Sequence, residues 1–280
     1  MRRARGLETL PLQAWLSALP RLARGEVHVI LARLPPPAGN RGAPAILDRD
    51  EQRRRRRLVF AADRHRFAWS HAVLRIVLAH YLGRAAAAVP FAPRSDPQAR
   101  PRLLSGARLR VGFSLSHAGD FAAVAVARGE MLGVDVELPR DRLDILAIAA
   151  AHFAPTETAM LQALAPTERM GAFLRLWTAK EAVLKALGTG LTRPLSDVVI
   201  AAGESTRHRR LTVSTKGIAL WSLARAGGTS ATLAVATERS AHPPRVWIGT
   251  CLPLSPRKLR LASRCRRGSG TIPDASCRRC

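Results

Sequence analysis

The sequence lacks the features of several protein classes. Its cysteines all lie near the end of the chain, which excludes a disulfide framework for the body of the protein; they are Cys251, Cys265, Cys277 and Cys280. Their single C-x-x-C has no second pair and no histidine at finger spacing, so a zinc site there has little support. No run of eighteen apolar residues occurs, so we expect no membrane span. Because Glu8 and Gln13 interrupt any signal-like apolar run, we expect a cytoplasmic protein.

Lysine and tyrosine are also rare. The chain has one Tyr and four Lys, and its net charge of +25 comes almost wholly from arginine. Such a surface attracts polyanions, whether nucleic acid, a phosphorylated small molecule or an acidic protein. Nucleic-acid binding is the alternative function that this charge suggests. We favour it less, because aromatic residues make up only 5% of the chain and no recognition helix is evident.

Apolar periodicity predicts an α+β protein with a rough internal repetition. The predicted strands cover 27–33, 111–115, 122–127, 131–137, 198–201, 211–214, 218–223 and 231–236, and the predicted helical regions cover 48–82 and 142–188. The order strand, helices, strands occurs twice, which divides the chain into units 1–130 and 131–241. The remaining segment, 242–280, has nine basic residues, one acid and no sustained apolar face, so we predict a disordered tail.

The first segment that indicates chemistry is Gly-Val-Asp-Val-Glu at 133–137. On a strand, Asp135 and Glu137 share one face, with their Cβ atoms roughly 7 Å apart. Two carboxylates so placed raise each other's pKa unless a cation lies between them, and hard oxygen ligands suit Mg²⁺ or Mn²⁺. A solvated strand end is the alternative interpretation.

The second segment is the predicted helix around 177–188. Glu181 falls on the apolar stripe of this helix, four residues after Trp177, where a carboxylate is costly unless it is paired or binds a metal. Lys185 lies one turn further on and could be its ion-pair partner. The functional alternative places Glu181 on a metal ion and Lys185 on a phosphate.

The third segment is Phe-Ser-Leu-Ser-His at 113–117, where a predicted strand gives way to a turn. Ser116 and His117 offer a hydroxyl and an imidazole to an anion. A nucleophilic serine with a histidine base would need the two side chains to face each other, which adjacent residues rarely do. Taken alone, the segment favours an ordinary turn over a functional site.

The order and spacing of these segments resemble the 4′-phosphopantetheinyl transferases of the surfactin-synthetase-activating type. The resemblance covers roughly residues 47–200 and depends most on 133–137 and on Trp-x-x-Lys-Glu-(x)3-Lys-(x)2-Gly-x-Gly-Leu at 177–191. Phe-Ala-Pro-Thr-Glu at 153–157 also looks like the Phe-x-x-x-Glu segment of that family.

The resemblance implies a metal site and a catalytic pair. Asp135, Glu137 and Glu181 would hold Mg²⁺, or Mn²⁺ in its place, at the pyrophosphate of coenzyme A. Glu181 would take the proton from the acceptor serine, and Lys185 would neutralise a pyrophosphate oxygen.

The resemblance also implies residues that bind the phosphate groups of coenzyme A. Ser116 and His117 would contact them, and Arg54 would bind the 3′-phosphate, with Arg66 and Arg100 as weaker candidates. Arg100 stands where the family has lysine, and the run 53–57 of five arginines leaves open which of them contacts the ligand or simply faces solvent.

The fold implied by the resemblance is α+β, with two similar halves related by a pseudo-two-fold axis. Each half would be a small antiparallel sheet packed with helices, with the active site in the cleft between the halves. The implied partners are coenzyme A and an acidic apo acyl or peptidyl carrier protein, and we expect a monomer. A homologue that binds coenzyme A without catalysis is a further alternative, and the type of carrier stays open.

Overall fold

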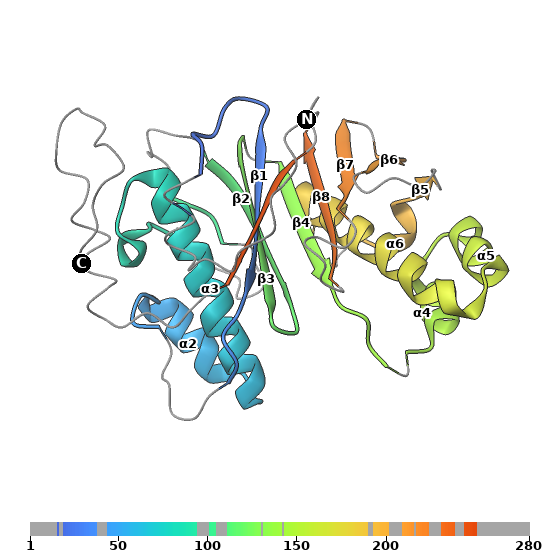
Figure 1. The fold of residues 1–280 in the computed structure, drawn as a ribbon, viewed down its shortest axis with the longest axis horizontal. Coiled ribbons are helices and arrows are strands. Elements are labelled where there is room, and N and C mark those ends of the chain that lie inside the picture. Colours follow the sequence, from blue (N-terminus) through green and yellow to red (C-terminus); the bar gives the residue numbers. More distant parts are fainter. Residues whose placement is uncertain are drawn as a thin grey trace, which may run out of the picture.

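The fold is described from a computed structural model (Figure 1). It describes residue 16 and residues 19–37, 44–93, 101–104, 111–129, 131–141, 143–189, 193–201, 209–215, 217–223, 231–238 and 244–250. Within these residues, no helix is long and apolar enough to cross a membrane.

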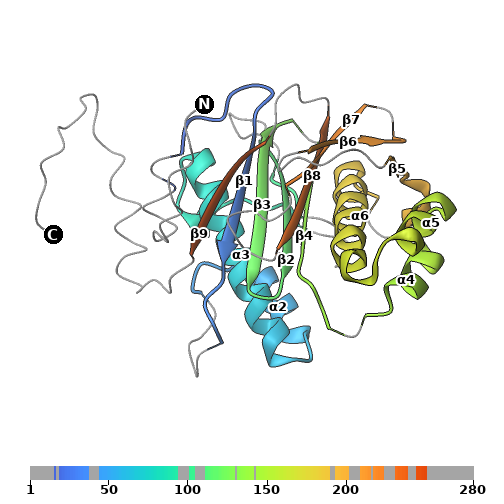
Figure 2. The same ribbon diagram turned by 45° about the vertical axis from the view of Figure 1, so that its right-hand side comes forward.

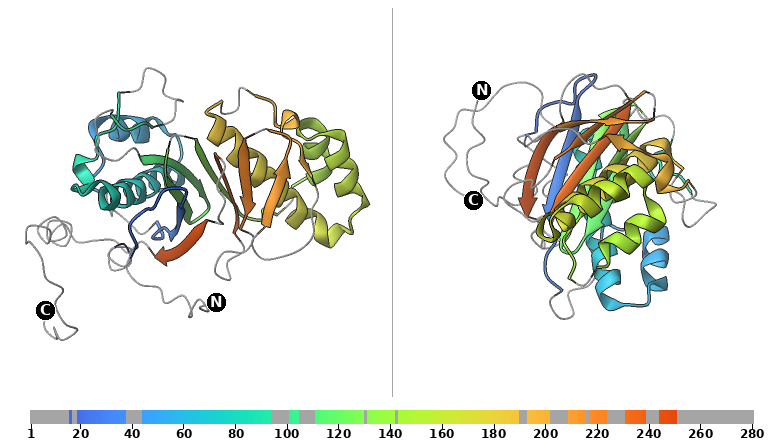
Figure 3. Two further views of the ribbon diagram at one scale, coloured as in Figure 1. Left: turned by 90° about the horizontal axis from the view of Figure 1, so that it is seen from above. Right: turned by 90° about the vertical axis from the view of Figure 1, so that its right-hand side faces the viewer.

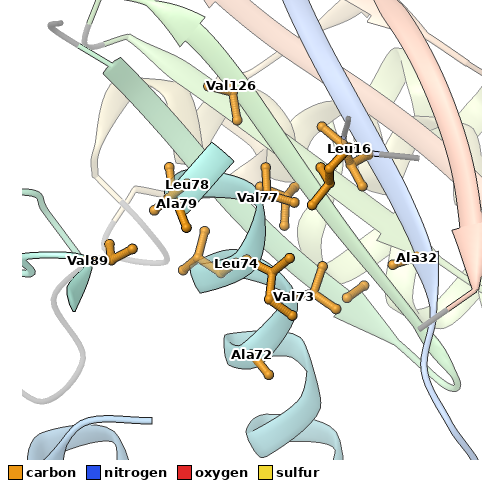
Figure 4. Close-up of a cluster of buried hydrophobic side chains, with 14 of the residues drawn as sticks. Leu16, Ala32, Ala72, Val73, Leu74, Val77, Leu78, Ala79, Val89 and Val126 are labelled. Carbon is orange, nitrogen blue, oxygen red and sulfur yellow. The ribbon is translucent and has the colours of Figure 1, made fainter. Parts of the chain in front are cut away.

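The first sheet has the strand order β2-β3-β1-β9. Its strands are β1 (Val27–Arg33), β2 (Val111–Ala118), β3 (Phe121–Arg128) and β9 (Arg245–Thr250). β3 pairs antiparallel with both β1 and β2, whereas β9 runs parallel to β1. One face of this sheet is covered by α3 (Ala61–Leu82), and Figure 4 shows Leu74 and Val77 of α3 in one buried apolar cluster with Val126 of β3.

The second sheet is antiparallel, with the order β4-β8-β7-β6-β5. Its strands are β4 (Leu132–Glu137), β5 (Ile200–Ala201), β6 (Arg209–Val213), β7 (Ile218–Ser222) and β8 (Thr232–Glu238). Its helices are α4 (Ile145–His152), α5 (Pro155–Ala163) and α6 (Pro166–Leu187), and short 3₁₀ turns lie at η1 (Ala86–Ala88) and η3 (Leu195–Asp197). α6 packs on β4 and β8 through Val183, Leu184 and Ala234, among other side chains.

The two sheets pack against each other between the helices. A third apolar cluster joins Val29 and Leu31 of β1 to Val134 of β4 and Val235 of β8, all fully buried. The layers therefore run α3, first sheet, second sheet, α6 (Figures 2 and 3). This α+β arrangement with mainly antiparallel pairing confirms the predicted fold class at that level.

The predicted helical region 48–82 is two helices. α2 (Arg49–Arg57) begins at Asp48, whose side chain accepts a hydrogen bond from the backbone of Glu51 while Glu51 caps Asp48 in return. Leu58 to Phe60 then interrupt the helix with extended backbone at Leu58 and Phe60. α2 contains no apolar residue, so apolar periodicity could not locate the boundary between the two helices.

The prediction of a disordered tail was wrong for its first part, because residues 245–250 form β9. β9 covers the edge of β1 that β3 leaves open, and an uncovered edge would expose unpaired backbone groups. The partner strand lies far earlier in the chain, so the local pattern of Arg245–Thr250 could not reveal the pairing. Residues 251–280, with all four cysteines, lie outside the described part.

Gly133 is where β4 and α6 approach most closely, and we predict that Gly133→Ala is strongly destabilising. A Cβ atom there would overlap the carbonyl oxygen of Ala182 and the backbone nitrogen of Ala186, neither of which can move without shifting α6. We expect the free energy of unfolding in urea to fall by about 2 kcal/mol or more.

The matched control is Gly171→Ala, inside α6. Its Cβ would meet only the end of the Arg175 side chain, at 3.3 Å, and alanine favours a helix by up to about 1 kcal/mol. Equal stability of both variants would contradict the close approach at Gly133.

Candidate active site

Side chains from both sheets and from α6 meet at one point. Lys185 of α6 donates to Oδ1 of Asp135 on β4 (2.6 Å) and to Oγ of Ser116 on β2 (3.0 Å). The Ser116 hydroxyl in turn donates to the same Oδ1 (2.7 Å). Asp135 is 3% exposed, which rules out the solvated strand end for this residue. Lys185 therefore pairs with Asp135, not with Glu181 one turn away on its own helix.

The alternation of β2 places two serines against β4. Ser114 and Ser116 are both buried, whereas His117 on the opposite face is exposed. Ser114 accepts a hydrogen bond from the backbone nitrogen of Val134 (3.1 Å). Sequence reasoning missed Ser114, although its spacing of two from Ser116 was a usable signal. Because β2 runs on to Ala118, Ser116 and His117 point apart, which excludes a serine nucleophile activated by its neighbour.

The second carboxylate oxygen of Asp135 has a different environment. Oδ2 is buried and has no hydrogen-bond partner in the described structure. Burying a carboxylate oxygen without a partner is costly, so this atom has an unused capacity to bind a cation.

Two glutamates lie within the electrostatic reach of Asp135. Desolvation and then the charge of Asp135 raise the pKa of Glu137, against the opposing effects of Arg140 and Lys185. Desolvation also raises the pKa of Glu181; Lys185 opposes this shift and Asp135 adds to it. A cation among these carboxylates would relieve the repulsion from Asp135, which adds to the effect of desolvation on both pKa values.

The three acids do not form a coordination group in this structure. Among the residues that it describes, no three Asp, Glu, His or Cys side chains are close enough to hold a metal ion. The cation at Asp135 is the ammonium of Lys185. The unpartnered Oδ2 and the set of carboxylate oxygens nevertheless fit the hard ligands that Mg²⁺ prefers, so the metal site stays a prediction.

Positive side chains surround the exposed end of β2. Arg66 of α3 donates to the carbonyl oxygen of Gly119 (3.0 Å) and pairs with Asp63 (2.7 Å). The pKa of His117 is lowered to about 4, by desolvation and then by the charges of Arg66, His71 and Lys185. His117 keeps an exposed surface beside these cations. An anion bound here would be favoured by all of these charges.

Arg54 lies over the ring of Phe67, with its guanidinium carbon 5.5 Å from the ring centroid. Its Nη1 is buried and has no hydrogen-bond partner in the described structure, so one donor of Arg54 is available to a ligand. Phe67 stacks on His71 at 4.0 Å between centroids, which links Arg54 to the cations around His117. Arg100 lies outside the described residues.

Comparison with known proteins identifies the family. A model described as the 4′-phosphopantetheinyl transferase superfamily matches residues 131–236. The 4′-phosphopantetheinyl transferase HetI of Nostoc sp. is 33% identical over 193 residues, which cover 67% of this chain and 79% of HetI. The chain belongs to the 4′-phosphopantetheinyl transferase superfamily.

Two further relatives match over shorter stretches. A putative 4′-phosphopantetheinyl transferase of Synechocystis sp. is 32% identical over 158 residues, covering 56% of this chain and 63% of the relative. The 4′-phosphopantetheinyl transferase AcpT of Escherichia coli is 34% identical over 102 residues, covering 36% of this chain and 49% of AcpT.

In this member of the superfamily, the lysine beside Glu181 is structural. Lys180 is fully buried and pairs with Glu157 of α5 (2.6 Å), and its ammonium also donates to the carbonyl oxygens of Leu195 and Val198. Glu157 accepts a further hydrogen bond from the backbone nitrogen of Ile200 (2.9 Å). Sequence reasoning gave Lys185 a role but gave Lys180 none. The pair joins α5, α6 and β5, and thereby fixes the helix that carries Glu181 and Lys185.

A second buried network holds α2 on α3. Glu51 accepts from Arg75 Nε (2.6 Å) and shares a hydrogen bond with His71 Nδ1 (2.9 Å), while Arg75 also pairs with Asp48. Burial acts to raise the pKa of Glu51, but His71 and Arg75 outweigh it and the pKa is lowered. Sequence reasoning did not predict this network, because its contacts depend on how α2 packs on α3. It fixes the helix that carries Arg54.

We predict that Asp135→Asn lowers the pKa of both Glu137 and Glu181, because the charge of Asp135 raises both values. The substitution also frees Lys185, whose positive charge lowers the pKa of both glutamates. Titration of ¹³C-labelled glutamate carboxyl groups by NMR measures the two values directly.

The control is Asp197→Asn, an exposed carboxylate in η3 that does not contribute to either shift. It should leave both pKa values unchanged. If Asp135→Asn also left them unchanged, the three carboxylates would not share one site.

Proposed function

We propose that this chain transfers the 4′-phosphopantetheine group of coenzyme A to the serine of an apo acyl or peptidyl carrier protein. The reaction would use Mg²⁺, or Mn²⁺ in its place, and release 3′,5′-ADP. The observation that carries the proposal is the meeting of Lys185 and Ser116 at a buried carboxylate, Asp135, with one unused oxygen. The names of the similar proteins, HetI and AcpT among them, support it.

We infer that the site lies in a cleft between two α+β halves related by a pseudo-two-fold axis, residues 1–130 and 131–241. Two features support this inference. Ser116 comes from the first sheet, whereas Asp135 and Lys185 come from the second sheet and α6. The first half would also include β9, because β9 pairs with β1 although it lies beyond residue 241 in the sequence.

Asp135 through Oδ2, together with Glu137 and Glu181, would hold the metal ion. When bound, the ion supplies positive charge that neutralises the pyrophosphate and its leaving group. Lys185 would exchange Asp135 for a pyrophosphate oxygen, since a more highly charged anion competes for the same ammonium. Ser116 would give up its donation to Oδ1 of Asp135 in order to donate to a phosphate.

The remaining cations would bind the other phosphate groups of coenzyme A. His117 stands beside Arg66 at the end of β2, and Arg54 presents a buried free donor from α2. We assign Arg54 to the 3′-phosphate, with Arg66 as a neighbouring contact. A dianionic phosphate would raise the pKa of His117 from its lowered value and thereby recruit a further positive charge.

In the transfer step, the acceptor serine oxygen forms a bond to the phosphorus that carries pantetheine. The bond from that phosphorus to the bridging oxygen breaks, and 3′,5′-ADP leaves with the bonding electron pair. Glu181 takes the serine proton, and its raised pKa makes it a better base than an ordinary carboxylate. No covalent enzyme intermediate is needed, so the protein acts by positioning and by neutralising charge.

Glu181→Gln should abolish transfer while the fold survives, because the amide cannot accept the serine proton. Incubation with coenzyme A, Mg²⁺ and a panel of apo carrier proteins, read out by mass gain of the carrier, should show a rate at least about a hundredfold lower. The thermal unfolding midpoint should stay close to that of the wild type.

Glu168→Gln is the matched control, since Glu168 is an exposed glutamate in the first turn of the same helix. It should transfer at the wild-type rate. Normal transfer by Glu181→Gln would refute the assigned role. Binding of coenzyme A without transfer by the wild-type chain would instead identify a degenerate homologue.

A further inference from the structure

The turn between α2 and α3 exposes two adjacent apolar side chains. Val59 is 80% exposed and Phe60 is 69% exposed, and the only other exposed large hydrophobic residue in the described part of the chain is Leu104, at 48%. A single exposed apolar side chain is ordinary on a protein surface, but two bulky ones together at a turn indicate a contact surface.

This turn is held in one conformation. The Arg64 guanidinium donates to the carbonyl oxygens of Leu58 (2.9 Å) and Val59 (2.8 Å), and its backbone nitrogen donates to that of Phe60 (3.0 Å). Val59 and Phe60 are therefore presented by an ordered turn, which lowers the entropy lost when a partner covers them.

The surroundings of the turn are cationic. Arg54 to Arg57 form the last turn of α2, immediately before it, and Arg56 and Arg57 are exposed. The nearest solvent-accessible acids on the two helices, Asp50 and Asp63, are already paired with arginines of their own helices. The surface thus combines an apolar centre with a positive rim, and its complement is an apolar side chain within an acidic surface.

The turn also lies near the proposed transfer site. Arg66, six residues after Phe60 and thus about 9 Å along α3, donates to the carbonyl oxygen of Gly119, just beyond His117. A standard protein interface covers about 800 Å² on each partner, which is a disc of about 16 Å radius. A partner whose serine reaches the site would extend over this turn.

We propose that Val59 and Phe60, with Arg56 and Arg57, form a docking surface for the acceptor carrier protein. This assignment rests on the proposed function. The occupant is an acidic carrier that places an apolar side chain beside its acceptor serine onto Phe60. The arginines orient the carrier as it approaches, and Phe60 holds it while the serine is in the site.

Phe60→Ser tests the apolar contact in a transfer assay with the apo acyl carrier protein of fatty-acid synthesis. Phe60 is the N-cap residue of α3, where serine is a favoured residue, so a weakened helix cannot explain a loss. We expect the KM for the carrier to rise about tenfold, with the KM for coenzyme A and kcat within about twofold. Leu104→Ser, beyond the other end of α3, is the control and should change none of these values.

Arg57→Glu and Arg84→Glu test the charged rim, because both change the net charge equally. Arg84 is exposed just beyond the C-terminal end of α3, about 33 Å from Phe60 along the 22-residue helix. Only Arg57→Glu should raise the carrier KM and flatten its dependence on salt. Equal effects of the two variants would overturn the docking surface in favour of a general attraction.

Direct binding separates the two proposals. A carrier whose acceptor serine is replaced by alanine should bind the wild-type chain about tenfold more tightly than the Phe60→Ser variant, as measured by calorimetry. Transfer by the wild type with no effect of Phe60→Ser would overturn the docking surface alone. A change of oligomeric state in Phe60→Ser with an unchanged carrier KM would also overturn the docking surface, because a second copy of the chain would then be the partner that covers the turn. Absence of transfer by the wild type to every carrier would overturn the proposed function.

Discussion

The buried carboxylate of Asp135 is the constraint on which the rest of the site depends. It lies where β2, β4 and α6 meet, and a charge in that position must be neutralised by its neighbours. Lys185 and Ser116 satisfy one oxygen, and the other has no partner in the described structure. The same charge adds to the raised pKa values of Glu137 and Glu181. Asp135 therefore both binds the ammonium of Lys185 and influences the two nearby carboxylates.

The rest of the described fold holds the partners of Asp135 in place. Gly133 lets β4 lie directly against α6, which brings Asp135 and Lys185 within hydrogen-bonding distance. The buried pair of Lys180 and Glu157 fixes the other side of α6, and breaking such a pair typically costs about 3–5 kcal/mol. The network around Glu51 does the same for α2, so the two helices that border the site are each anchored by buried ion pairs.

The sequence predicted the parts of the site that depend on local pattern. Period-two alternation placed Asp135 on a strand, and helical periodicity placed Glu181 and Lys185 one turn apart, as the structure has them. It could not predict contacts between distant segments. Lys185 was expected to pair with Glu181 or a phosphate, yet the packing of α6 on β4 brings it to Asp135. The pairing of β9 with β1 and the burial of Lys180 also depend on tertiary packing, for which a single sequence carries no local signal.

A crystal structure of the chain with coenzyme A and Mg²⁺ would test the central role of Asp135 most directly. We expect an ion about 2.1 Å from Oδ2 of Asp135, with Glu137 and Glu181 facing it. We also expect the ammonium of Lys185 to have moved from Oδ1 of Asp135 to the pyrophosphate. An ion bound away from Asp135, or a Lys185 still paired with Asp135 beside bound coenzyme A, would contradict that role.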